Sequence, residues 1–380
     1  MTHINFIATA TFGLEAVVKR ELTRLGMTVT GGGDGRVDFC GGFLEMARAN
    51  VHLRASDRVL LVMGEFEALT FEELFEQTKA LPWEDIISED GNFSVDGKSI
   101  KSALFSVPDC QRIVEKAVVE RLKTKYKLDW FPKTGAVYKI QVALLKDKAT
   151  LTIDTTGAGL HKRGYRPVTS KAPIRETLAA AMIDLSFWRK DRAFLDPMCG
   201  SGTIAIEAAL IAKGIPAGLN RSFVSENWEC ADKSAWDTAR GLSHGFGDCP
   251  RGTPTIFASD IDPKLIAQAK ENAQKAGVSD IINFSVADIK DITLPKADYG
   301  IIITNPPYGQ RIGEQKNLPK LYKQLKRLMH TNPTWGTYVI TSDENFERDF
   351  GHKAHARRKL FNGNTKTNYY QYHPPKPPRV

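Results

Sequence analysis

Cysteine is scarce in this chain, and long apolar runs are missing. Five cysteines are spread over 380 residues with no CxxC pair, which argues against a disulfide framework or a zinc site and is typical of a reducing compartment. No apolar run approaches the roughly 18–20 residues that a membrane span needs. The first residues also lack the basic start, apolar core and cleavage site of a secretion signal. The sequence therefore predicts a cytoplasmic protein with no membrane partner.

The charge is unbalanced toward basic residues. Lys and Arg number 52 against 44 Asp and Glu, a formal net charge of +8. A basic surplus permits a polyanionic partner such as nucleic acid, but does not establish one. The eight histidines show no metal-ligand spacing, so no metal is expected. The length suggests two or three domains, and no obligate protein partner is evident.

The first 155 residues have the mixed texture of small α+β domains. Residues 1–65 combine an alternating segment at 4–9, an amphipathic helix pattern at 13–25 and a glycine cluster at 31–35. That cluster could be a phosphate-binding loop, but without a strand–loop–helix context a turn is favoured. The next ninety residues predict helices at 70–80 and 109–126 and strands at 92–96, 138–145 and 148–154.

Basic side chains gather around the second of these helices and continue into a glycine-rich linker. They have two interpretations, a solvated helix face and a surface that contacts RNA phosphates. The candidates for RNA contact are Lys98, Lys101, Arg112, Lys116, Arg163 and Arg166.

From residue 171 onward, helical patterns alternate with short apolar strands. This alternation predicts an α/β fold with a doubly wound parallel sheet. The expected strands are 193–196, 255–260, 282–286, 299–304 and 336–341. Two further segments, at 354–361 and 367–373, predict a terminal antiparallel hairpin, which brings the sheet to seven strands.

The first of these strands ends at Asp196 and enters a glycine-rich turn that launches a helix at Thr203. Glycines let a ligand lie against bare backbone, and a helix N-terminus offers free N–H groups. The turn is neither a Walker loop nor a GxGxxG dinucleotide loop. Cys199 within it is interpreted as a packing residue rather than a nucleophile.

The next two strands also end on acids. Asp260 is placed to accept hydrogen bonds from ribose hydroxyls, and Asp288 from an adenine amino group. Asp262 is better explained as a helix N-cap, because Pro263 follows it. Carboxyl ends of parallel strands meet at one edge of the sheet, so these acids and Asp196 are expected to converge there.

The fourth strand ends in Asn305, Pro306, Pro307 and Tyr308. An exocyclic base amine is a poor nucleophile because its lone pair is delocalised. The Asn305 Oδ1 and the Pro306 carbonyl can accept its hydrogen bonds and aim it at a methyl group, while Tyr308 can stack on a flipped-out base. These four residues are the predicted catalytic element.

Residues 165–373, including the terminal hairpin, resemble the class I S-adenosylmethionine-dependent methyltransferases that act on amino groups. More narrowly, the chain resembles the ribosomal large-subunit RNA methyltransferase L family. The stretches that carry this are HKRGYR (161–166), APIRETLA (172–179), DPMCGSGT (196–203), NPPYG (305–309) and KLFNG (359–363).

The resemblance implies a ferredoxin-like domain at 1–65, a THUMP RNA-binding domain at 66–155, a linker at 156–170 and a Rossmann-like methyltransferase domain at 171–380. It implies methylation of guanosine N2 in RNA, with 23S ribosomal RNA as the expected substrate and tRNA still open. The cofactor would be S-adenosylmethionine, released as S-adenosylhomocysteine.

By motif match, the resemblance also assigns a cofactor site. Its residues are Arg175, Glu176 and Thr177 before the first strand, Asp196, Cys199, Gly200, Ser201, Gly202 and Thr203 in the turn, and Asp260, Ile261, Asp288, Ile289 and Asn305 at later strand ends. Two features bear on the substrate. About forty residues at 214–252 are inserted, as in the family, whereas the second methyltransferase domain of fused relatives is lacking.

Three other readings stay open. The same catalytic element serves adenine N6 in nucleic acid and glutamine amides in proteins, although the basic N-terminal region disfavours a protein substrate. A different class, an RNA-binding ribosome-assembly factor without turnover, would keep the fold. The intact acids at the strand ends and Asn305 argue against it.

Overall fold

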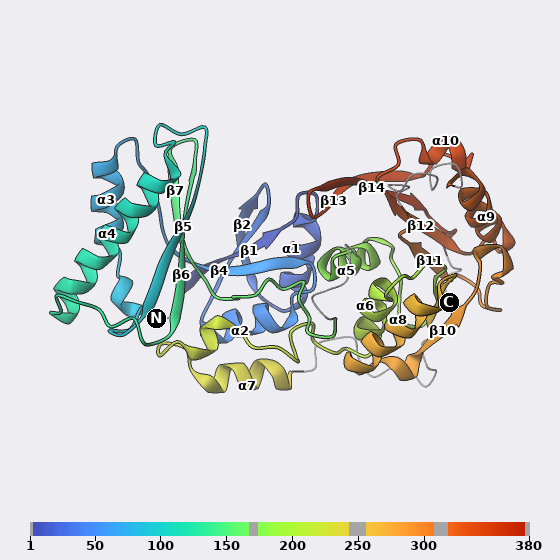
Figure 1. Cartoon of the computed structure of the whole chain (residues 1–380), viewed down its shortest axis with the longest axis horizontal. Helices are drawn as coiled ribbons and strands as arrows, with labels where there is room; N and C mark the ends of the chain where they lie inside the picture. Colours follow the sequence, from blue (N-terminus) through green and yellow to red (C-terminus); the bar gives the residue numbers. More distant parts are fainter. Residues whose placement is uncertain (1–2, 167–173, 243–255, 308–317, 377–380) are drawn as a thin grey trace. The chain divides into compact units, whose positions relative to one another are not determined.

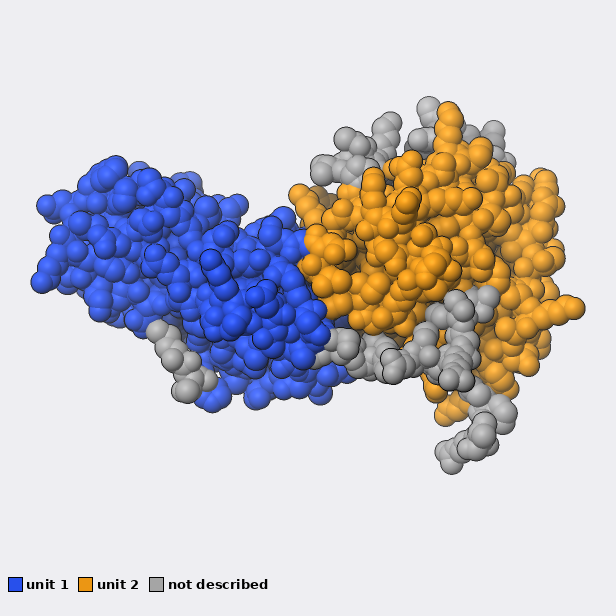
Figure 2. All heavy atoms as spheres, turned by 90° about the horizontal axis from the view of Figure 1, so that it is seen from below, with its two compact units in different colours: residues 1–10, 19–160, 221–242 blue, residues 11–18, 161–220, 243–380 orange. Residues whose placement is uncertain are grey.

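The computed structural model describes residues 3–166, 174–242, 256–307 and 318–376. The chain forms two compact units, coloured separately in Figure 2. The N-terminal unit comprises residues 1–10, 19–160 and 221–242. The second unit comprises residues 11–18, 161–220 and 243–380, and we call it the catalytic unit because it contains the predicted catalytic element. The chain therefore passes between the units several times.

A single seven-stranded sheet runs through the N-terminal unit (Figure 1). Its strand order is β2-β3-β1-β4-β7-β6-β5. The strands are β1 (Ile4–Ala10), β2 (Thr28–Gly33), β3 (Arg36–Gly41), β4 (Ser56–Glu67), β5 (Asn92–Ile100), β6 (Val137–Leu145) and β7 (Lys148–Asp154). The 12-residue β4 pairs with β1 through its first half and with β7 from Leu60 onward, so one strand joins both halves of the sheet.

Helices cover this sheet because alternate strand residues are apolar and buried. They are α1 (Glu15–Arg24), α2 (Phe43–His52), α3 (Phe71–Ala80), η1 (Trp83–Asp85) and α4 (Val107–Tyr126). Helix α3 begins with a capping box, in which the Thr70 side chain accepts from the Glu73 N–H and Glu73 accepts from the Thr70 N–H. Figure 1 shows α3 and α4 side by side against β5 and β6.

Residues 221–242 belong to the N-terminal unit although they follow helix α6 (Thr203–Ala212) of the catalytic unit. We call this segment the clasp; it contains η2 (Val224–Asn227) and α7 (Lys233–Gly241). The Trp228 ring stacks on Tyr138 at 5.1 Å, and its Nε1 donates to the Val137 carbonyl at 3.1 Å. The His52 Nε2 also lies 2.7 Å from the Ala239 carbonyl oxygen. The clasp is therefore part of the core of this unit.

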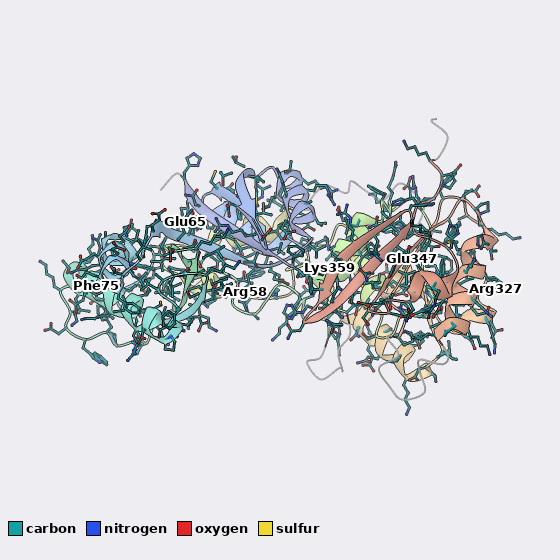
Figure 3. All side chains as sticks on the ribbon, turned by 90° about the horizontal axis from the view of Figure 1, so that it is seen from above. Arg58, Glu65, Phe75, Arg327, Glu347 and Lys359 are labelled. Atoms are coloured by element: carbon teal, nitrogen blue, oxygen red, sulfur yellow. The ribbon has the colours of Figure 1, made fainter. Side chains whose placement is uncertain are left out.

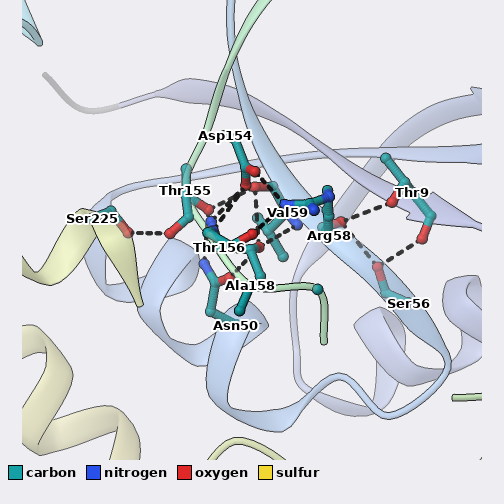
Figure 4. A network of polar contacts seen from close by, with 12 residues as sticks. Thr9, Asn50, Ser56, Arg58, Val59, Asp154, Thr155, Thr156, Ala158 and Ser225 are labelled. Atoms are coloured by element: carbon teal, nitrogen blue, oxygen red, sulfur yellow. Dashed lines mark hydrogen bonds and ion pairs between the residues drawn. The ribbon is translucent and has the colours of Figure 1, made fainter. Parts of the chain in front are cut away.

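A buried polar network joins the clasp to the end of the sheet (Figure 4). Ser225 Oγ donates to the Thr155 carbonyl at 2.7 Å, and the Asn50 side chain bonds to the hydroxyls of Thr155 and Thr156 at 2.9 and 2.7 Å. Arg58 forms an ion pair with Asp154. Burial of satisfied polar groups fixes one arrangement of the chain here, because each unmade bond would be costly.

The catalytic unit contains a second seven-stranded sheet, of order β10-β9-β8-β11-β12-β14-β13. The strands are β8 (Phe194–Asp196), β9 (Ile256–Asp260), β10 (Ile282–Val286), β11 (Ile301–Thr304), β12 (Gly336–Thr341), β13 (Ala356–Asn362) and β14 (Thr365–Tyr372). The first five are parallel, and β14 and β13 are antiparallel additions. The predicted seven-stranded doubly wound sheet with a terminal hairpin is confirmed.

Helices pack on both faces of this sheet (Figure 1). One face carries α5 (Glu176–Leu185), α6 (Thr203–Ala212) and α8 (Pro263–Lys275), and the other carries α9 (Leu318–Thr331) and α10 (Phe346–Phe350). Short helices η3 (Ser279–Ile281) and η4 (Ile289–Asp291) flank β10. Within the described ranges, no helix is both long and apolar enough to cross a membrane.

Three details of the N-terminal unit differ from the sequence-based expectation. The glycines at 31–33 lie in β2 rather than in a turn, which forms at Asp34 and Gly35 instead. Helix α2 and the long β4 were not predicted. The expected strand at 92–96 extends to Ile100 because β6 pairs with it along its whole length.

Candidate active site

The loop between β8 and α6 is shaped by two glycines with positive φ, Gly200 at +54° and Gly202 at +84°. A Cβ on Gly202 would lie 3.0 Å from the Cβ of Ala269 on α8, so a larger residue does not fit. Asn272 of the same helix donates to the Ser201 carbonyl at 3.0 Å. The loop is thus pressed against α8, with the N-terminus of α6 directed to the carboxyl edge of the sheet.

Asp260 at the end of β9 holds this loop. Its Oδ2 accepts from the Gly200 N–H at 2.9 Å, and its Oδ1 accepts from the Asp262 N–H at 3.0 Å. The Cys199 N–H adds a bond to the Ser259 carbonyl at 2.8 Å. Asp262 caps α8 as predicted, because its side chain accepts from the Lys264 N–H. The first two strand ends are therefore locked together.

Asp196 is fully buried, and burial raises the pKa of its carboxyl group to about 7. The nearby Thr304 hydroxyl opposes this rise in pKa, although the two groups do not meet hydrogen-bond geometry. Asp196 Oδ1 accepts from the Met198 N–H at 3.3 Å, whereas Oδ2 has no partner among the described residues. A buried carboxylate oxygen without a partner fits a site for a cationic ligand group.

Two more polar atoms without partners lie at the end of β11. Thr304 Oγ1 and Asn305 Oδ1 are buried and receive no hydrogen bond within the described ranges. The buried Pro306 follows. Buried acceptors normally have partners, so these atoms mark the place where a ligand or substrate donates. Tyr308, the fourth residue of the predicted catalytic element, lies outside the described residues.

The edge beyond β9 and β10 combines apolar and acidic groups. Ile261 is 67% exposed, a flat apolar surface next to Asp260. Asp288 caps η4 by accepting from the Lys290 N–H, which lowers the pKa of its carboxyl group. The Ile289 side chain is buried in the core instead.

Arg166 links the start of α5 to the loop between β8 and α6, which is called the cofactor loop below. Arg166 Nη1 donates to Thr203 Oγ1 at 3.0 Å, and its Nη2 lies 2.9 Å from Glu176 Oε1. The Arg175 N–H donates to Asn362 Oδ1 at 3.2 Å. Thr177 is buried at the start of α5. The sequence analysis includes Asn362 in a family-like stretch but predicts no contact for it, because its partner is 187 residues away.

The two linker arginines are not available to RNA. Arg163 is 4% exposed and forms an ion pair with the fully buried Glu207 at 3.3 Å, and Arg166 is held by Glu176 and Thr203. Because their neighbours in the sequence are basic, phosphate contacts were predicted for both arginines. In the folded structure, each arginine instead forms an ion pair with a buried glutamate of the same unit. We therefore correct the prediction: Arg163 and Arg166 position other segments of the chain rather than contact RNA.

The four cations proposed for RNA contact in the N-terminal unit fall into two groups. Gly97 faces Gln111 and Val107 of α4, so its neighbour Lys98 projects from the opposite face of β5, with Lys101 exposed in the turn beyond. Arg112 is paired with Asp109 on α4, and Lys116 lies over the Phe75 ring at 5.6 Å. Helix α4 and the sheet therefore lie between the pair Lys98 and Lys101 and the pair Arg112 and Lys116.

Cys199 is not equipped for nucleophilic chemistry. Burial and the nearby Asp196 and Asp260 charges raise the pKa of its thiol far above the ordinary value, so thiolate is absent at neutral pH. Among the described residues, no group of three or more His, Cys, Asp or Glu side chains converges as a metal site. The site therefore offers orientation and hydrogen bonding.

A doubly wound sheet with a terminal hairpin, a glycine loop under an acid and buried acceptors at the fourth strand end define a class I S-adenosylmethionine-dependent methyltransferase. Family models place the domains along the chain: an RlmL ferredoxin-like domain at 5–60, a THUMP domain at 68–154 and an RMKL-like methyltransferase domain at 163–371. The chain belongs to the RMKL-like methyltransferase family, and it is an RNA methyltransferase that uses S-adenosylmethionine.

Individual relatives agree. A Bacillus subtilis (strain 168) protein named "Putative RNA methyltransferase YpsC" is 50% identical over 98% of this chain and 96% of its own length. "Ribosomal RNA large subunit methyltransferase K/L" of Psychromonas ingrahamii is 34% identical over 94% of the chain, but the match spans only 48% of that relative.

Solved structures share the whole architecture. A Listeria monocytogenes protein described as a "predicted N6-adenine-specific DNA methylase" superimposes with a TM-score of 0.93 at 47% identity, covering 99% of this chain and 97% of that one. SMU.472 in complex with SAH has a TM-score of 0.91 at 38% identity, covering 99% and 100%. The cofactor product thus occurs on this fold in a near relative.

Proposed function

We propose that this chain methylates the exocyclic N2 of a guanosine in RNA, with ribosomal large-subunit RNA as the substrate. The observation that carries the proposal is the buried Asn305 Oδ1 next to Pro306 at the catalytic edge, an acceptor that has no partner among the described residues. The substrate follows from the curated K/L relatives, which are named for the large ribosomal subunit and of which the chain spans about half.

The residues fit the cofactor by type and by position. Asp196 Oδ2 suits the ammonium group of the methionine moiety, the Thr203 N–H at the start of α6 suits its carboxylate, and Asp260 suits the ribose. The Gly202 N–H is already bonded to the Cys199 carbonyl at 2.8 Å. Ile261 offers an apolar surface and Asp288 an acceptor for the adenine. When bound, the cofactor supplies an electrophilic methyl group.

The chain's own part in the reaction is orientation. Asn305 Oδ1 and the Pro306 carbonyl accept the two N–H groups of the base amine, turn its lone pair toward the methyl carbon and disperse the positive charge that develops on nitrogen. An amine held in this way would attack the methyl carbon in line as the carbon–sulfur bond breaks, with S-adenosylhomocysteine as the leaving group and no covalent bond to the enzyme. The amine is cationic after transfer, and its proton can leave to water without a strong base.

The test is incubation of the chain and labelled S-adenosylmethionine with RNA from cells that lack this protein, followed by nucleoside digestion. Label is expected in N2-methylguanosine of large ribosomal RNA and is expected to vanish with Asn305→Ala. Binding of S-adenosylhomocysteine by that variant is the control for folding. Label in tRNA, or no label despite cofactor binding, contradicts the substrate assignment.

One relative supports a second candidate, adenine N6 in nucleic acid. The Listeria monocytogenes neighbour carries that activity in its description, and an adenine amine presents the same two N–H groups to Asn305. The digestion above separates the two candidates, because N6-methyladenosine and N2-methylguanosine are distinct products.

A further inference from the structure

The outermost strand of the catalytic sheet, β13, is a cationic edge. Arg357, Arg358 and Lys359 follow one another on it, and all three are exposed. Glu347 approaches Arg357 only at 3.9 Å. Among the described residues, no acid pairs with Arg358 or Lys359. A strand edge with surplus positive charge attracts a polyanion.

Alternate residues of β13 form a stripe on one face. Arg357, Lys359 and Phe361 point to the same side because side chains alternate along a strand. Lys366 of β14 stands opposite Phe361 in the register and joins them. Its Nζ lies 3.7 Å from Oε1 of the exposed Glu344, so this pair is weak. Lys359 Nζ lies 5.4 Å from the Phe361 ring centroid. Figure 3 labels Lys359 on the terminal hairpin. Arg358 projects from the opposite face.

An exposed aromatic ring extends the stripe. Phe12, which belongs to the catalytic unit, meets Phe361 edge to face with centroids 6.3 Å apart, and it is 52% exposed. A large apolar side chain left in water beside cations is the arrangement that binds unpaired nucleotides, since the ring stacks on a base while the cations contact phosphates.

The stripe ends at the catalytic edge. Strand β14 runs antiparallel to β12, and their last pair joins Asn368 to Thr341, the carboxyl end of β12. The hairpin turn at 362–365 therefore projects past the edge where Asp196 and Asn305 lie. Contacts lead from this turn to the cofactor loop: Asn362 to Arg175, then Glu176 to Arg166, then Arg166 to Thr203.

We propose that Arg357, Lys359, Phe361, Lys366 and Phe12 bind the single-stranded RNA that flanks the nucleotide being methylated. The lysines and the arginine contact successive phosphates, and the aromatic pair stacks on a neighbouring unpaired base. This rests on the proposed function, because the target base must lie at Asn305 for the flanking strand to pass along the hairpin.

The test measures RNA binding apart from catalysis. A fluorescein-labelled, single-stranded 12-nucleotide RNA is titrated with the full chain over a range of salt concentrations. The double variant Arg357→Gln/Lys359→Gln is expected to bind at least tenfold more weakly. The slope of log K against log salt should become less negative by about 1.4 in this variant, because each of the two lost phosphate contacts contributes roughly 0.7 on single strands. Phe361→Leu is expected to lose about tenfold in affinity with an unchanged salt slope.

Arg358→Gln is the matched control, because it removes the same charge from the opposite face of the same strand. Its RNA affinity should stay within twofold of wild type, and all variants should bind S-adenosylhomocysteine as the wild type does. Unchanged RNA binding by the double variant, an equal loss in Arg358→Gln, or no RNA binding by the wild type overturns the proposal.

The two proposals fail separately. If the stripe variants lose RNA binding but no nucleoside gains label, the stripe stands and the proposed function falls. If methyl transfer proceeds and the double variant keeps the KM of the wild type, the stripe proposal falls alone.

Discussion

Arg163 and Glu207 form an ion pair in the interior of the catalytic unit, with Nε and Oε1 3.3 Å apart and side-chain exposures of 2% and 0%. The Tyr165 hydroxyl donates to the same carboxylate at 3.3 Å. Arg163, a residue of the predicted linker, thus contacts the middle of α6, the helix that follows the cofactor loop.

Removing one partner of this pair leaves a buried charge without compensation. Glu207→Ala is therefore expected to lower the free energy of unfolding by about 3–5 kcal/mol, measured by urea denaturation followed by circular dichroism. The double variant Arg163→Met/Glu207→Leu should recover most of that loss, because two apolar residues replace the pair. A loss in the double variant that equals the sum of the single losses would contradict the coupling.

The raised pKa of Asp196 predicts a pH dependence. Its carboxyl group moves from an ordinary value of 3.8 to about 7 on folding, so the folded state binds the extra proton between these values. The free energy of unfolding of the ligand-free protein should fall as the pH rises from about 4 to about 7 and then level off. Asp196→Asn should be the more stable form at pH 8, by a few kcal/mol as an order of magnitude.

Cofactor affinity should move in the opposite direction. An ionised Asp196 attracts the ammonium group of S-adenosylhomocysteine, so calorimetric affinity is expected to rise as the pH increases from 6 to 8. Asp196→Asn should bind weakly and with no such rise. A pH-independent affinity in the wild type would refute the assignment of the methionine moiety to this residue.

Gly202 and Gly200 make a matched pair. Both have positive φ, but a Cβ on Gly202 meets Ala269 at 3.0 Å, whereas nothing lies within 4 Å of a Cβ on Gly200. Gly200→Ala should cost only the left-handed strain of about 1–2 kcal/mol. Gly202→Ala should cost clearly more and also weaken S-adenosylhomocysteine binding, because α8 and the loop must separate. Equal unfolding midpoints and equal affinities would argue against this packing.

Trp228 tests the clasp. It is 2% exposed and stacked on Tyr138, so Trp228→Ala is expected to destabilise the N-terminal unit by about 3–5 kcal/mol. Trp130→Ala, at a residue that is 74% exposed, should change stability by less than about 0.5 kcal/mol. Hydrogen exchange of β6 amides would register the first loss and not the second.

The sequence predicted the catalytic sheet well because its strands are short, apolar and bounded by chemical signals. Asp196, Asp260 and Asn305 stand at strand ends, and strand ends of a parallel sheet meet at one edge. Nothing comparable marks α2, whose apolar pattern is short, or β4, whose role depends on partners on both sides.

The roles of charged residues were predicted less well than the strands of the catalytic sheet. Arg163 and Arg166 looked like surface cations because their acidic partners, Glu207 and Glu176, lie 44 and 10 positions away along the chain. No binding role was predicted for Arg357 or Lys359, although Lys359 lies in the family-like stretch 359–363. Only the sheet order makes β13 an edge, and only the register places its turn beside the cofactor loop. The spacing of residues along the sequence predicts on which face of a helix or strand a side chain lies. It does not predict which residue from a distant part of the chain contacts that side chain.

The clasp also has a consequence during synthesis. The N-terminal unit lacks Trp228 and α7 until residue 242 has been made, although its sheet is complete at residue 154. At about 5–20 residues per second, the stretch after residue 160 takes roughly 4–16 s to translate. During that interval the nascent N-terminal unit lacks the segment that covers Tyr138 and α2, and its core is completed only after the cofactor loop has been made. The order of translation thereby disfavours the accumulation of a complete N-terminal unit without the start of the methyltransferase domain.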